Sequence, residues 1–349
     1  MQALVVRSPG DVALEERPAP TAGLGEILVR PTVIGICGTD LDIVEGTIDP
    51  TFVRYPIVLG HEWTGVVESA AVTTGRPDTE SPAAGAHVVV EGIVPCGHCA
   101  QCVAGNTNRC VTYDEFGFVR DGAATGLIAV PSRLAHVVGD SVSSHSAVLV
   151  EPAAVVLRAL SRVAPSPGQR VLIIGDGTVG LLAARLSRLW SPASVTMLGL
   201  RPDQAPLATA AGVDDFSTRP RSGEFDLVVE AAGSAASTRT ALGAPARGGT
   251  VVLLGYPGKD ANVPFPVDDT VNGDVMIVGS FGYTSTAWRQ VVALLNAGQL
   301  DLSFLVTHRF PLQDWESAMS ALRTGTGARA KVVLEVAPDS PAAALRPEQ

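Results

Sequence analysis

The five cysteines divide into a cluster of four and one isolated residue. The cluster follows the spacing C-x2-C-x2-C-x7-C and consists of Cys96, Cys99, Cys102 and Cys110. Four thiolates this close in sequence can close a tetrahedron around one zinc ion, an arrangement typical of structural sites. An iron–sulfur cluster is the alternative, but the last gap of seven residues does not match the ferredoxin spacing C-x2-C-x2-C-x3-C-P. We therefore expect structural zinc here.

The isolated cysteine, Cys37, lies in the sequence Gly-Ile-Cys-Gly-Thr-Asp. Two other ligand types follow at a distance: His61 and Glu62 in Gly-His-Glu, and Glu151 in Val-Glu-Pro. A thiolate, an imidazole and a carboxylate can give zinc three protein ligands and leave a fourth position for water or substrate. This composition is typical of a catalytic zinc site.

A third constellation is the glycine triplet Gly175, Gly177 and Gly180, which follows the apolar run 171–174 as G-x-G-x-x-G. In a dinucleotide loop the three glycines make the turn, let the backbone approach the pyrophosphate and let the helix pack closely. Thr178 and Val179 begin that helix, whose free N–H groups and dipole favour phosphate. The triplet alone is weak evidence, but strand, helix and second strand follow in order. A tight turn without a ligand is the alternative.

The second strand of this unit, 195–198, ends at Gly199 without the acidic residue that binds the adenosine ribose hydroxyls. Glycine leaves room for a 2′-phosphate, and Arg201 can supply a bidentate cation. These residues predict NADP(H) over NAD(H). The alternative is that Arg201 is a solvated loop residue near Asp203 and that the cofactor is NAD. Gly255 and Ser280 follow later parallel strands, where we expect them to line the nicotinamide pocket.

These motifs require two kinds of domain. Up to about residue 150, short apolar stretches separated by Pro, Gly and Asp indicate a mostly β domain. From about Gly168, fully apolar runs alternate with helical segments, which indicates a doubly wound parallel sheet of the Rossmann type in an α/β protein. We expect a catalytic zinc domain at 1–154, completed by 286–349, and a dinucleotide-binding domain at 155–285. The tail from residue 337 is rich in Pro and Ala, which favours disorder.

Composition limits the partners. Of 349 residues, 46% are hydrophobic and 17% charged, which supports well-filled cores. The formal net charge of -10, with no window that concentrates Lys and Arg, argues against nucleic acid. No stretch reaches the ~18 uninterrupted apolar residues of a membrane helix, so we expect a cytoplasmic protein that acts on small molecules. An odd cysteine count in a long chain makes a disulfide scaffold improbable.

Taken in order, Cys-Gly-Thr-Asp, Gly-His-Glu, the four-cysteine lobe and G-x-G-x-x-G resemble the zinc-containing medium-chain dehydrogenase/reductase family, over residues 1 to about 336. The pairing of Gly-His-Glu with Val-Glu-Pro is similar to the polyol and sugar dehydrogenase branch. The resemblance implies that the mostly β domain is GroES-like. It also implies that Cys37 and His61 bind zinc, that Glu151 is a third ligand, and that Glu62 is either a ligand or a carboxylate beside the ligands.

Further roles follow from the same resemblance. Asp40 matches the residue that holds the ligating histidine through its second nitrogen, and Thr39 matches the hydroxyl that relays the substrate proton. Many relatives carry histidine at the last stage of proton transfer, where this chain has Asp42; a base, a substrate contact and an exposed loop residue are all open. Lys331 resembles a cation that meets the cofactor pyrophosphate, with a plain strand-edge lysine as the alternative.

We therefore expect a homodimeric or homotetrameric dehydrogenase with two zinc ions per subunit. It would transfer hydride between a secondary alcohol of a polyol, sugar or cyclitol, or the matching ketone, and NAD(P). Three alternatives remain: a dehydrogenase of simple alcohols, the zinc-free reductase branch of the same superfamily, and a non-catalytic zinc module. The acidic charge and the glycine loop weigh against the module.

Overall fold

The computed structural model describes residues 1–70, 81–112, 114–258 and 260–336, so the tail predicted to be disordered lies outside the described residues. Two compact units divide the chain. The first contains Met1–Glu151, Val292–Gly325 and the strand that begins at Lys331, and the second contains Pro152–Val291 and Thr326–Ala330. The changes at Glu151 and Val292 fall inside two continuous helices, α4 (Val150–Val163) and α9 (Ser285–Asn296).

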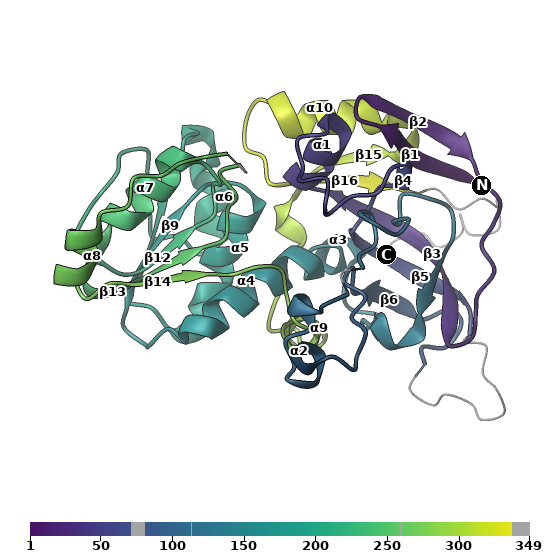
Figure 1. Ribbon diagram of the computed structural model, residues 1–349, viewed down its shortest axis with the longest axis horizontal. Coiled ribbons are helices and arrows are strands. Elements are labelled where there is room, and N and C mark those ends of the chain that lie inside the picture. Colours follow the sequence, from purple (N-terminus) through teal and green to yellow (C-terminus); the bar gives the residue numbers. More distant parts are fainter. Residues whose placement is uncertain (71–80, 113, 259, 337–349) are drawn as a thin grey trace. The chain divides into compact units, whose positions relative to one another are not determined.

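The first unit is built on β-sheets. The larger sheet has the order β15-β16-β3-β5-β6-β8, with β7 also paired to β3, and a smaller sheet has the order β2-β1-β4 (Figure 1). Its strands are β1 (Gln2–Ser8), β2 (Asp11–Glu16), β3 (Glu26–Ile36), β4 (Ile57–Val58), β5 (Glu62–Ser69), β6 (His87–Val90), β7 (Ile128–Pro131), β8 (Ala135–Val137), β15 (Val306–Pro311) and β16 (Lys331–Glu335).

Strand β3 positions the isolated cysteine. Its side chains alternate between buried and half-buried from Glu26 onward, as expected of a strand with one face on a core, and its last four residues are all buried. The register against β5 shifts between Pro31 and Val33, because proline has no N–H to donate to the ladder. The strand ends at Ile36, so that Cys37 lies where the buried strand gives way to helix α1 (Gly38–Glu45).

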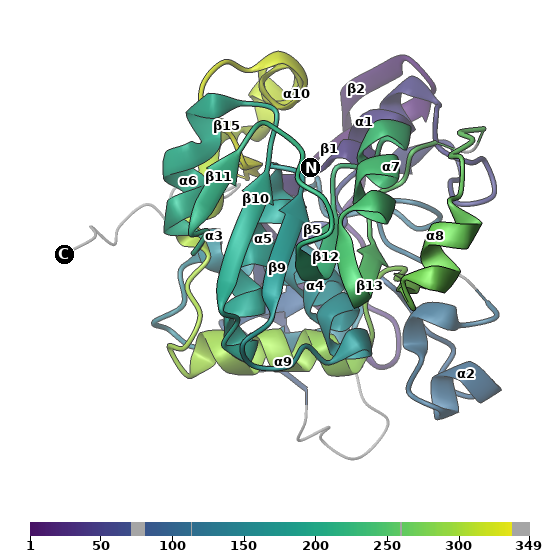
Figure 2. The ribbon, with the colours of Figure 1, turned by 90° about the vertical axis from the view of Figure 1, so that its left-hand side faces the viewer.

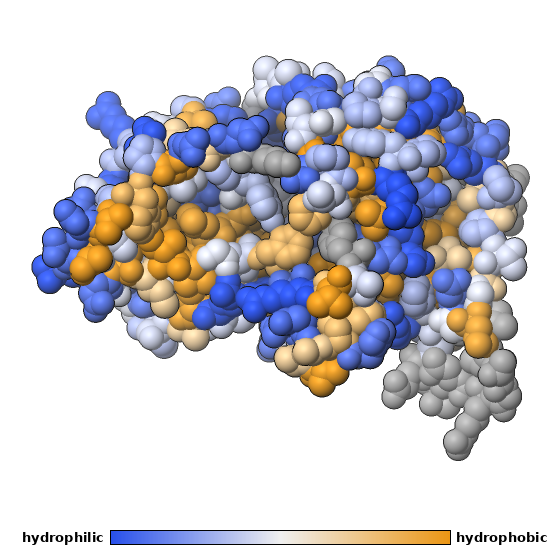
Figure 3. All heavy atoms as spheres, in the orientation of Figure 1, coloured by the Kyte–Doolittle hydropathy of each residue, from blue (hydrophilic) through white to orange (hydrophobic). Residues whose placement is uncertain are grey.

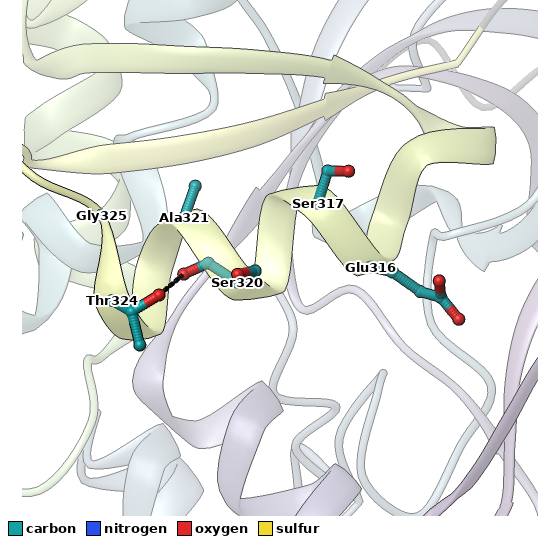
Figure 4. A pocket seen from close by; sticks show the side chains of 6 residues that line it. All are labelled: Glu316, Ser317, Ser320, Ala321, Thr324 and Gly325. Atoms are coloured by element: carbon teal, nitrogen blue, oxygen red, sulfur yellow. Dashed lines mark hydrogen bonds between the residues drawn. The ribbon is translucent and has the colours of Figure 1, made fainter.

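Short helices connect these strands. In the first unit they are α1, α2 (Ala100–Val103), α3 (Ser144–Ala147) and α10 (Trp315–Thr324), with the 3-10 turns Thr107–Arg109, Ser132–Leu134, Ser303–Leu305 and Leu312–Asp314. Helix α10 packs against β15 and β16. It carries a shallow depression lined by one acidic residue and five small ones (Figure 4): Glu316, Ser317, Ser320, Ala321, Thr324 and Gly325.

The second unit contains a six-stranded, all-parallel sheet in the order β11-β10-β9-β12-β13-β14 (Figure 2). Counted by appearance in the unit, that order is 3-2-1-4-5-6, the arrangement of doubly wound dinucleotide-binding folds. The strands are β9 (Arg170–Ile174), β10 (Ser194–Leu198), β11 (Asp215–Ser217), β12 (Phe225–Glu230), β13 (Pro245–Leu253) and β14 (Met276–Gly279).

Helices α5 (Thr178–Ser187), α6 (Ala205–Ala210) and α7 (Ala235–Gly243) pack against this sheet, and α8 (Val267–Asn272) precedes β14. The turns Arg188–Trp190 and Pro202–Gln204 complete the unit. The predicted fold class, a Rossmann sheet plus a mostly β domain, is confirmed. Within the described part of the chain, no helix combines the length and apolarity needed to cross a membrane.

Candidate metal centres and cofactor site

The four clustered cysteines form a compact lobe around α2. Their sulfur atoms all lie within 4.8 Å of one another, and the Sγ atoms of Cys96 and Cys102 are 3.9 Å apart. A tetrahedral zinc ion with Zn–S bonds of about 2.3 Å holds its sulfurs about 3.8 Å apart. The geometry therefore fits one zinc ion with four thiolate ligands.

Backbone N–H groups point at these sulfurs. The N–H of Cys99 donates to Cys96 Sγ over 3.4 Å, and the N–H of Cys102 donates to Cys99 Sγ over 3.4 Å. The backbone of His98, and then that of Cys99, lowers the pKa of the Cys96 thiol, which favours the thiolate that a metal requires. The His98 imidazole itself is exposed and lies 2.9 Å from the Cys96 carbonyl, as expected of a residue outside the ligand set.

The second centre is built where β3 ends and α1 begins. Cys37 is the N-cap of α1: its Sγ accepts the Thr39 N–H over 3.2 Å, and its own N–H donates to Asp40 Oδ2 over 2.9 Å. This reciprocal capping fixes the cysteine at a helix amino terminus, where the dipole favours a thiolate. Cys37 Sγ lies 3.3 Å from Nε2 of His61, which comes directly before β5.

Asp40 orients the histidine. Asp40 Oδ1 and His61 Nδ1 are 3.4 Å apart, and both residues are buried. The two atoms lie at ion-pair distance but do not form a hydrogen bond, and a carboxylate near Nδ1 favours a proton on that nitrogen, which leaves the lone pair of Nε2 on the side of Cys37. Burial lowers the pKa of His61, but the negative charges of Asp40 and Cys37 outweigh it and hold the pKa well above its usual value. The negative charges of Asp40 and Cys37 thus favour a positive charge beside His61, which suits a metal cation.

A buried ion pair lies beside this centre. Lys331 Nζ pairs with Glu62 Oε2 and also donates to the Ile36 carbonyl over 3.3 Å. Both side chains are almost fully buried, and Gly35 of β3 makes room for them, because a Cβ there would overlap the Glu62 carboxylate. Burial lowers the pKa of Lys331, but the negative charges of Glu62 and Cys37 raise it by more than burial lowers it. The ammonium therefore stays charged.

The neighbours of β16 correct one expectation. Because β16 pairs with β15 on one side and β3 on the other, Lys331 is not at a sheet edge, and the strand-edge alternative is wrong.

Glu151 lies in the first turn of α4. Desolvation of the half-buried side chain, together with the negative charge of Glu62, raises the pKa of Glu151 to about 8, against the opposing charges of His61 and Lys331. At this centre, the described residues whose ligand atoms lie within 4.8 Å of one another are Cys37, Asp40 and His61. Glu62 and Glu151 act on the centre through their charges from outside that group.

Thr39 and Asp42 lie on successive turns of α1. Thr39 is half-buried and touches Cys37 through its backbone N–H. Asp42 is exposed, and its carboxylate accepts the Thr47 hydroxyl over 3.0 Å while its carbonyl accepts the Thr47 N–H over 2.9 Å. Asp42 therefore has a local partner at the end of the helix.

The glycine loop of the second unit connects β9 to α5. Gly175 has φ of 117°, and a Cβ there would lie 2.9 Å from the Ala231 carbonyl carbon. A Cβ on Gly180 would overlap the Gly175 carbonyl, whereas a Cβ on Gly177 would meet only open space. Gly177 caps α5 without a side-chain hydrogen bond, so the N–H groups at Thr178 and Val179 begin a helix with no side-chain cap. This cradle fits a pyrophosphate.

The space beside Gly199, at the end of β10, was expected to be empty, but it is filled. A Cβ on Gly199 would lie 2.6 Å from the Phe216 ring and 2.8 Å from Asp176 Oδ2, so these two side chains fill the room. Asp176 Oδ2 accepts the N–H groups of Leu200 and Arg201 over 3.0 Å each, and Oδ1 pairs with Arg201 Nη2 over 3.0 Å. Arg201 is thus anchored and is not a freely solvated loop residue.

Asp176 is a residue that sequence reasoning missed. It occupies the first variable position of G-x-G-x-x-G, and its acidic side chain there was the available signal. Glu230 was also missed: it is fully buried, and its Oε1 accepts the N–H groups of Ala232 and Gly233 over 2.9 Å each. Both carboxylates hold loops at the carboxyl ends of parallel strands, where ligands bind in such sheets.

Gly255 and Ser280 lie at the same ends. A Cβ on Gly255 would overlap the Gly233 backbone, so the two loops approach closely. Ser280 donates its N–H to the Leu253 carbonyl over 3.0 Å, and its buried hydroxyl has no protein partner. A buried hydroxyl in this position is available to a ligand.

Comparison with known proteins identifies the family. Residues 23–140 match the alcohol dehydrogenase GroES-like domain, and residues 144–336 match the glucose dehydrogenase C-terminus. The L-threonine 3-dehydrogenase of Streptomyces coelicolor is 32% identical over 354 residues, which cover 96% of this chain and 99% of that protein. The chain belongs to the zinc-containing medium-chain alcohol dehydrogenase family.

Two further similar proteins are also dehydrogenases. The sorbitol dehydrogenase of Bacillus subtilis strain 168 is 29% identical over 336 residues, covering 91% of this chain and 92% of that protein. A solved structure described as a zinc-binding dehydrogenase of Sinorhizobium meliloti 1021, bound to NADP, has a TM-score of 0.86 at 25% identity, covering 96% and 98% of the two chains. This dehydrogenase therefore falls in the polyol branch and is an NAD(P)-dependent oxidoreductase. The prediction of an enzyme is confirmed, and the alternatives of a zinc-free reductase and a non-catalytic module are wrong.

Proposed function

We propose that the enzyme transfers a hydride between NADP(H) and a secondary alcohol of a polyol, sugar or cyclitol, or the matching ketone. The observation that carries the proposal is the group formed by Cys37, Asp40 and His61, whose ligand atoms lie within 4.8 Å of one another. Similarity to a sorbitol dehydrogenase and to the glucose dehydrogenase C-terminus supports the substrate class.

The metal-binding roles start from that group. Cys37 and His61 hold a zinc ion, Glu151 serves as the third ligand, and Glu62 is either a further ligand or a carboxylate beside the ion. A zinc ion in such a site lowers the pKa of a substrate hydroxyl and polarises a substrate carbonyl. Lys331 supports this role, since its ammonium balances one of the carboxylate charges in the buried region.

The remaining residues of the first unit hold or move protons. Asp40 keeps the proton on His61 Nδ1 and so keeps Nε2 available as a ligand. Thr39 accepts the proton of the substrate hydroxyl and passes it outward. Asp42 then receives this proton. Its side chain is exposed on the next turn of α1, so it can release the proton to water.

The second unit binds the cofactor. The loop from β9 to α5 holds the pyrophosphate, Arg201 contacts the 2′-phosphate beyond Gly199, and Gly255 and Ser280 line the nicotinamide site. The loop residues are Gly175, Gly177, Thr178, Val179 and Gly180. The NADP bound in the Sinorhizobium meliloti dehydrogenase supports the choice of NADP(H).

We further propose that the four-cysteine lobe holds a second, structural zinc ion, which makes two per subunit. Its four thiolates leave no position for a substrate. Zinc there keeps the loop from Cys96 to Cys110 folded.

We also propose a homodimer or homotetramer. Strand β14 is the last in its sheet, and exposed apolar side chains lie on β14, on α8 and just before it: Phe265, Val267, Val271 and Met276. Figure 3 shows apolar residues gathered over this part of the second unit. A second copy placed there would cover these side chains and pair an open sheet edge. Light scattering that finds only a monomer at micromolar concentration would contradict this part of the proposal.

A second candidate substrate is an amino alcohol. The observation that favours it is the identity of 32% to the L-threonine 3-dehydrogenase of Streptomyces coelicolor. Simple secondary alcohols are a third class.

A spectrophotometric screen tests the proposal. Formation of reduced nicotinamide is followed at one pH with sorbitol, sugars, aminocyclitols, L-threonine and simple secondary alcohols, each with NADP and with NAD. We expect the highest kcat/KM for a polyol, sugar or cyclitol with NADP. Turnover of simple alcohols alone would contradict the substrate class, and a tenfold preference for NAD would contradict the cofactor.

A further inference from the structure

The segment Thr326–Ala330 has an unusual place in the fold. It lies in sequence between α10 and β16, both in the first unit, yet it belongs to the second unit. Gln204, which is fully buried at the end of the turn after β10, anchors it. Gln204 Nε2 donates to the Arg329 carbonyl over 2.8 Å, and Gln204 Oε1 accepts the Arg329 N–H over 2.6 Å. These two bonds fix the backbone of Arg329 beside the carboxyl end of β10.

Arg329 thereby joins the charged group around Asp176. Arg201 Nη2 pairs with Asp176 Oδ1 and approaches the Arg329 carbonyl to 3.5 Å. Burial and the charge of Arg201 lower the pKa of Arg329, while the charge of Asp176 raises it, so the Arg329 guanidinium lies within the electrostatic influence of both side chains. The three side chains carry two positive charges and one negative charge.

Arg201 also has an unused donor. Its Nη1 is buried and has no hydrogen-bond partner in the protein, although Nη2 is bound to Asp176. A buried donor without an acceptor is costly, and guanidinium groups favour oxygen anions that accept two parallel bonds. The adenosine ribose of a dinucleotide binds at the end of the second strand of such a sheet, which is β10.

We propose that Arg329 and Arg201 together bind the 2′-phosphate of NADP(H), and that Arg329 is a determinant of cofactor preference. The inference rests on the proposed function, which assigns this phosphate to Arg201 alone. Asp176 acts as a positioning residue: it holds Arg201 through Nη2 and leaves Nη1 for the phosphate. NAD(H) has a neutral hydroxyl at this place and gains nothing from a second guanidinium.

The test measures binding and does not depend on turnover. The full-length, zinc-loaded protein is titrated by calorimetry with 2′,5′-ADP and with 5′-AMP, which differ by the phosphate in question. The variants are Arg329→Gln and Arg201→Gln, with Arg239→Gln as a matched control because Arg239 is an exposed arginine on α7 of the same unit. The contacts of Gln204 go to the backbone of Arg329, so the substitution keeps them.

We expect wild type and Arg239→Gln to prefer 2′,5′-ADP, and Arg329→Gln to reduce the ratio of the two affinities about tenfold, the loss of one charge-assisted contact. Arg329→Lys, which keeps the charge, should recover part of that preference. If wild type prefers 2′,5′-ADP and Arg329→Gln keeps the ratio, the role of Arg329 is wrong and the NADP proposal stands. If wild type prefers 5′-AMP, the NADP proposal and this inference both fail, while the substrate screen still tests the dehydrogenase.

Discussion

The four-cysteine lobe and the Cys37 centre differ in how the chain assembles them. The lobe takes its ligands from one short segment, and its cysteines are only half-buried. The Cys37 centre joins the end of β3, the start of α1 and the residue before β5, beside an ion pair contributed by β5 and β16. A local, saturated ligand set stabilises its own loop, whereas an incomplete set assembled from distant segments can offer a metal to a substrate.

The largest effect should come from the incomplete set. His61→Ala removes one of the two proposed zinc ligands, which lie 3.3 Å apart, so we expect kcat/KM to fall at least about a thousandfold and zinc content to fall by one ion per subunit. Rates are measured with the best substrate of the screen, and zinc is measured by mass spectrometry. His98→Ala, in the lobe but outside its ligand set, is the matched control and should keep both zinc ions. Equal losses in the two variants would remove the distinction between the sites.

The buried pair should matter for stability. Lys331→Met leaves the Glu62 carboxylate buried without its partner, which we expect to lower the free energy of unfolding by about 3–5 kcal/mol. Urea unfolding followed by circular dichroism measures the loss. The double variant Glu62→Gln with Lys331→Met removes both charges and should recover much of it. If the single and double variants are equally stable, the pair is not what makes this region differ from the lobe.

A substitution in the lobe should lower stability more than activity, the opposite of His61→Ala. Cys99→Ser removes one thiolate, while the serine hydroxyl can still cap α2, so we expect loss of one zinc ion and a melting temperature lower by about 5 °C, with activity within tenfold of wild type. Limited proteolysis should then cut between Cys96 and Cys110. Loss of activity as complete as in His61→Ala, in protein that remains folded, would show that the lobe has a catalytic role.

A smaller effect is expected next to His61. Asp40→Asn weakens the acceptor at His61 Nδ1 and also the cap of α1, and we expect a loss of about 10- to 100-fold in zinc affinity or activity. Competition with a chelator measures the affinity of this centre separately from that of the lobe. Unchanged affinity and unchanged kcat together would show that Asp40 serves the helix alone.

The smallest effect is expected at Asp42. Its carboxylate is exposed and already accepts the Thr47 hydroxyl, so Asp42→Asn should lower kcat only about twofold to fivefold while shifting the pH profile of kcat. Thr47→Val, which removes the neighbouring hydroxyl and keeps the carboxylate, is the control. An identical pH profile in Asp42→Asn would remove this residue from the proton path.

Local motifs could be predicted because their residues are close in sequence. The spacing of the four cysteines predicted a compact lobe, the glycine triplet predicted a strand–turn–helix, and the alternation of strands and helices predicted the fold class. The geometry around Asp176 depends on how one loop meets the end of the next strand. For that reason the space beside Gly199 was expected to be empty, although Asp176 and Phe216 fill it.

Long-range register was beyond prediction. Lys331 meets Glu62 only because β16 and β5 lie on opposite sides of β3, where Gly35 lacks a side chain. Nothing near Lys331 in the sequence signals a partner 269 residues away. The docking of Arg329 on Gln204 has the same origin, because segments 125 residues apart exchange two hydrogen bonds.

The visible spectrum of cobalt-substituted protein tests the central claim, that one centre is open and the other closed. Cobalt(II) replaces zinc in Cys99→Ser, where the Cys37 centre remains, and in His61→Ala, where the lobe remains; imidazole is then added. We predict that the absorption bands shift in Cys99→Ser, because a free position accepts the new ligand, and stay unchanged in His61→Ala. Bands that shift in both variants, or in neither, would contradict the account.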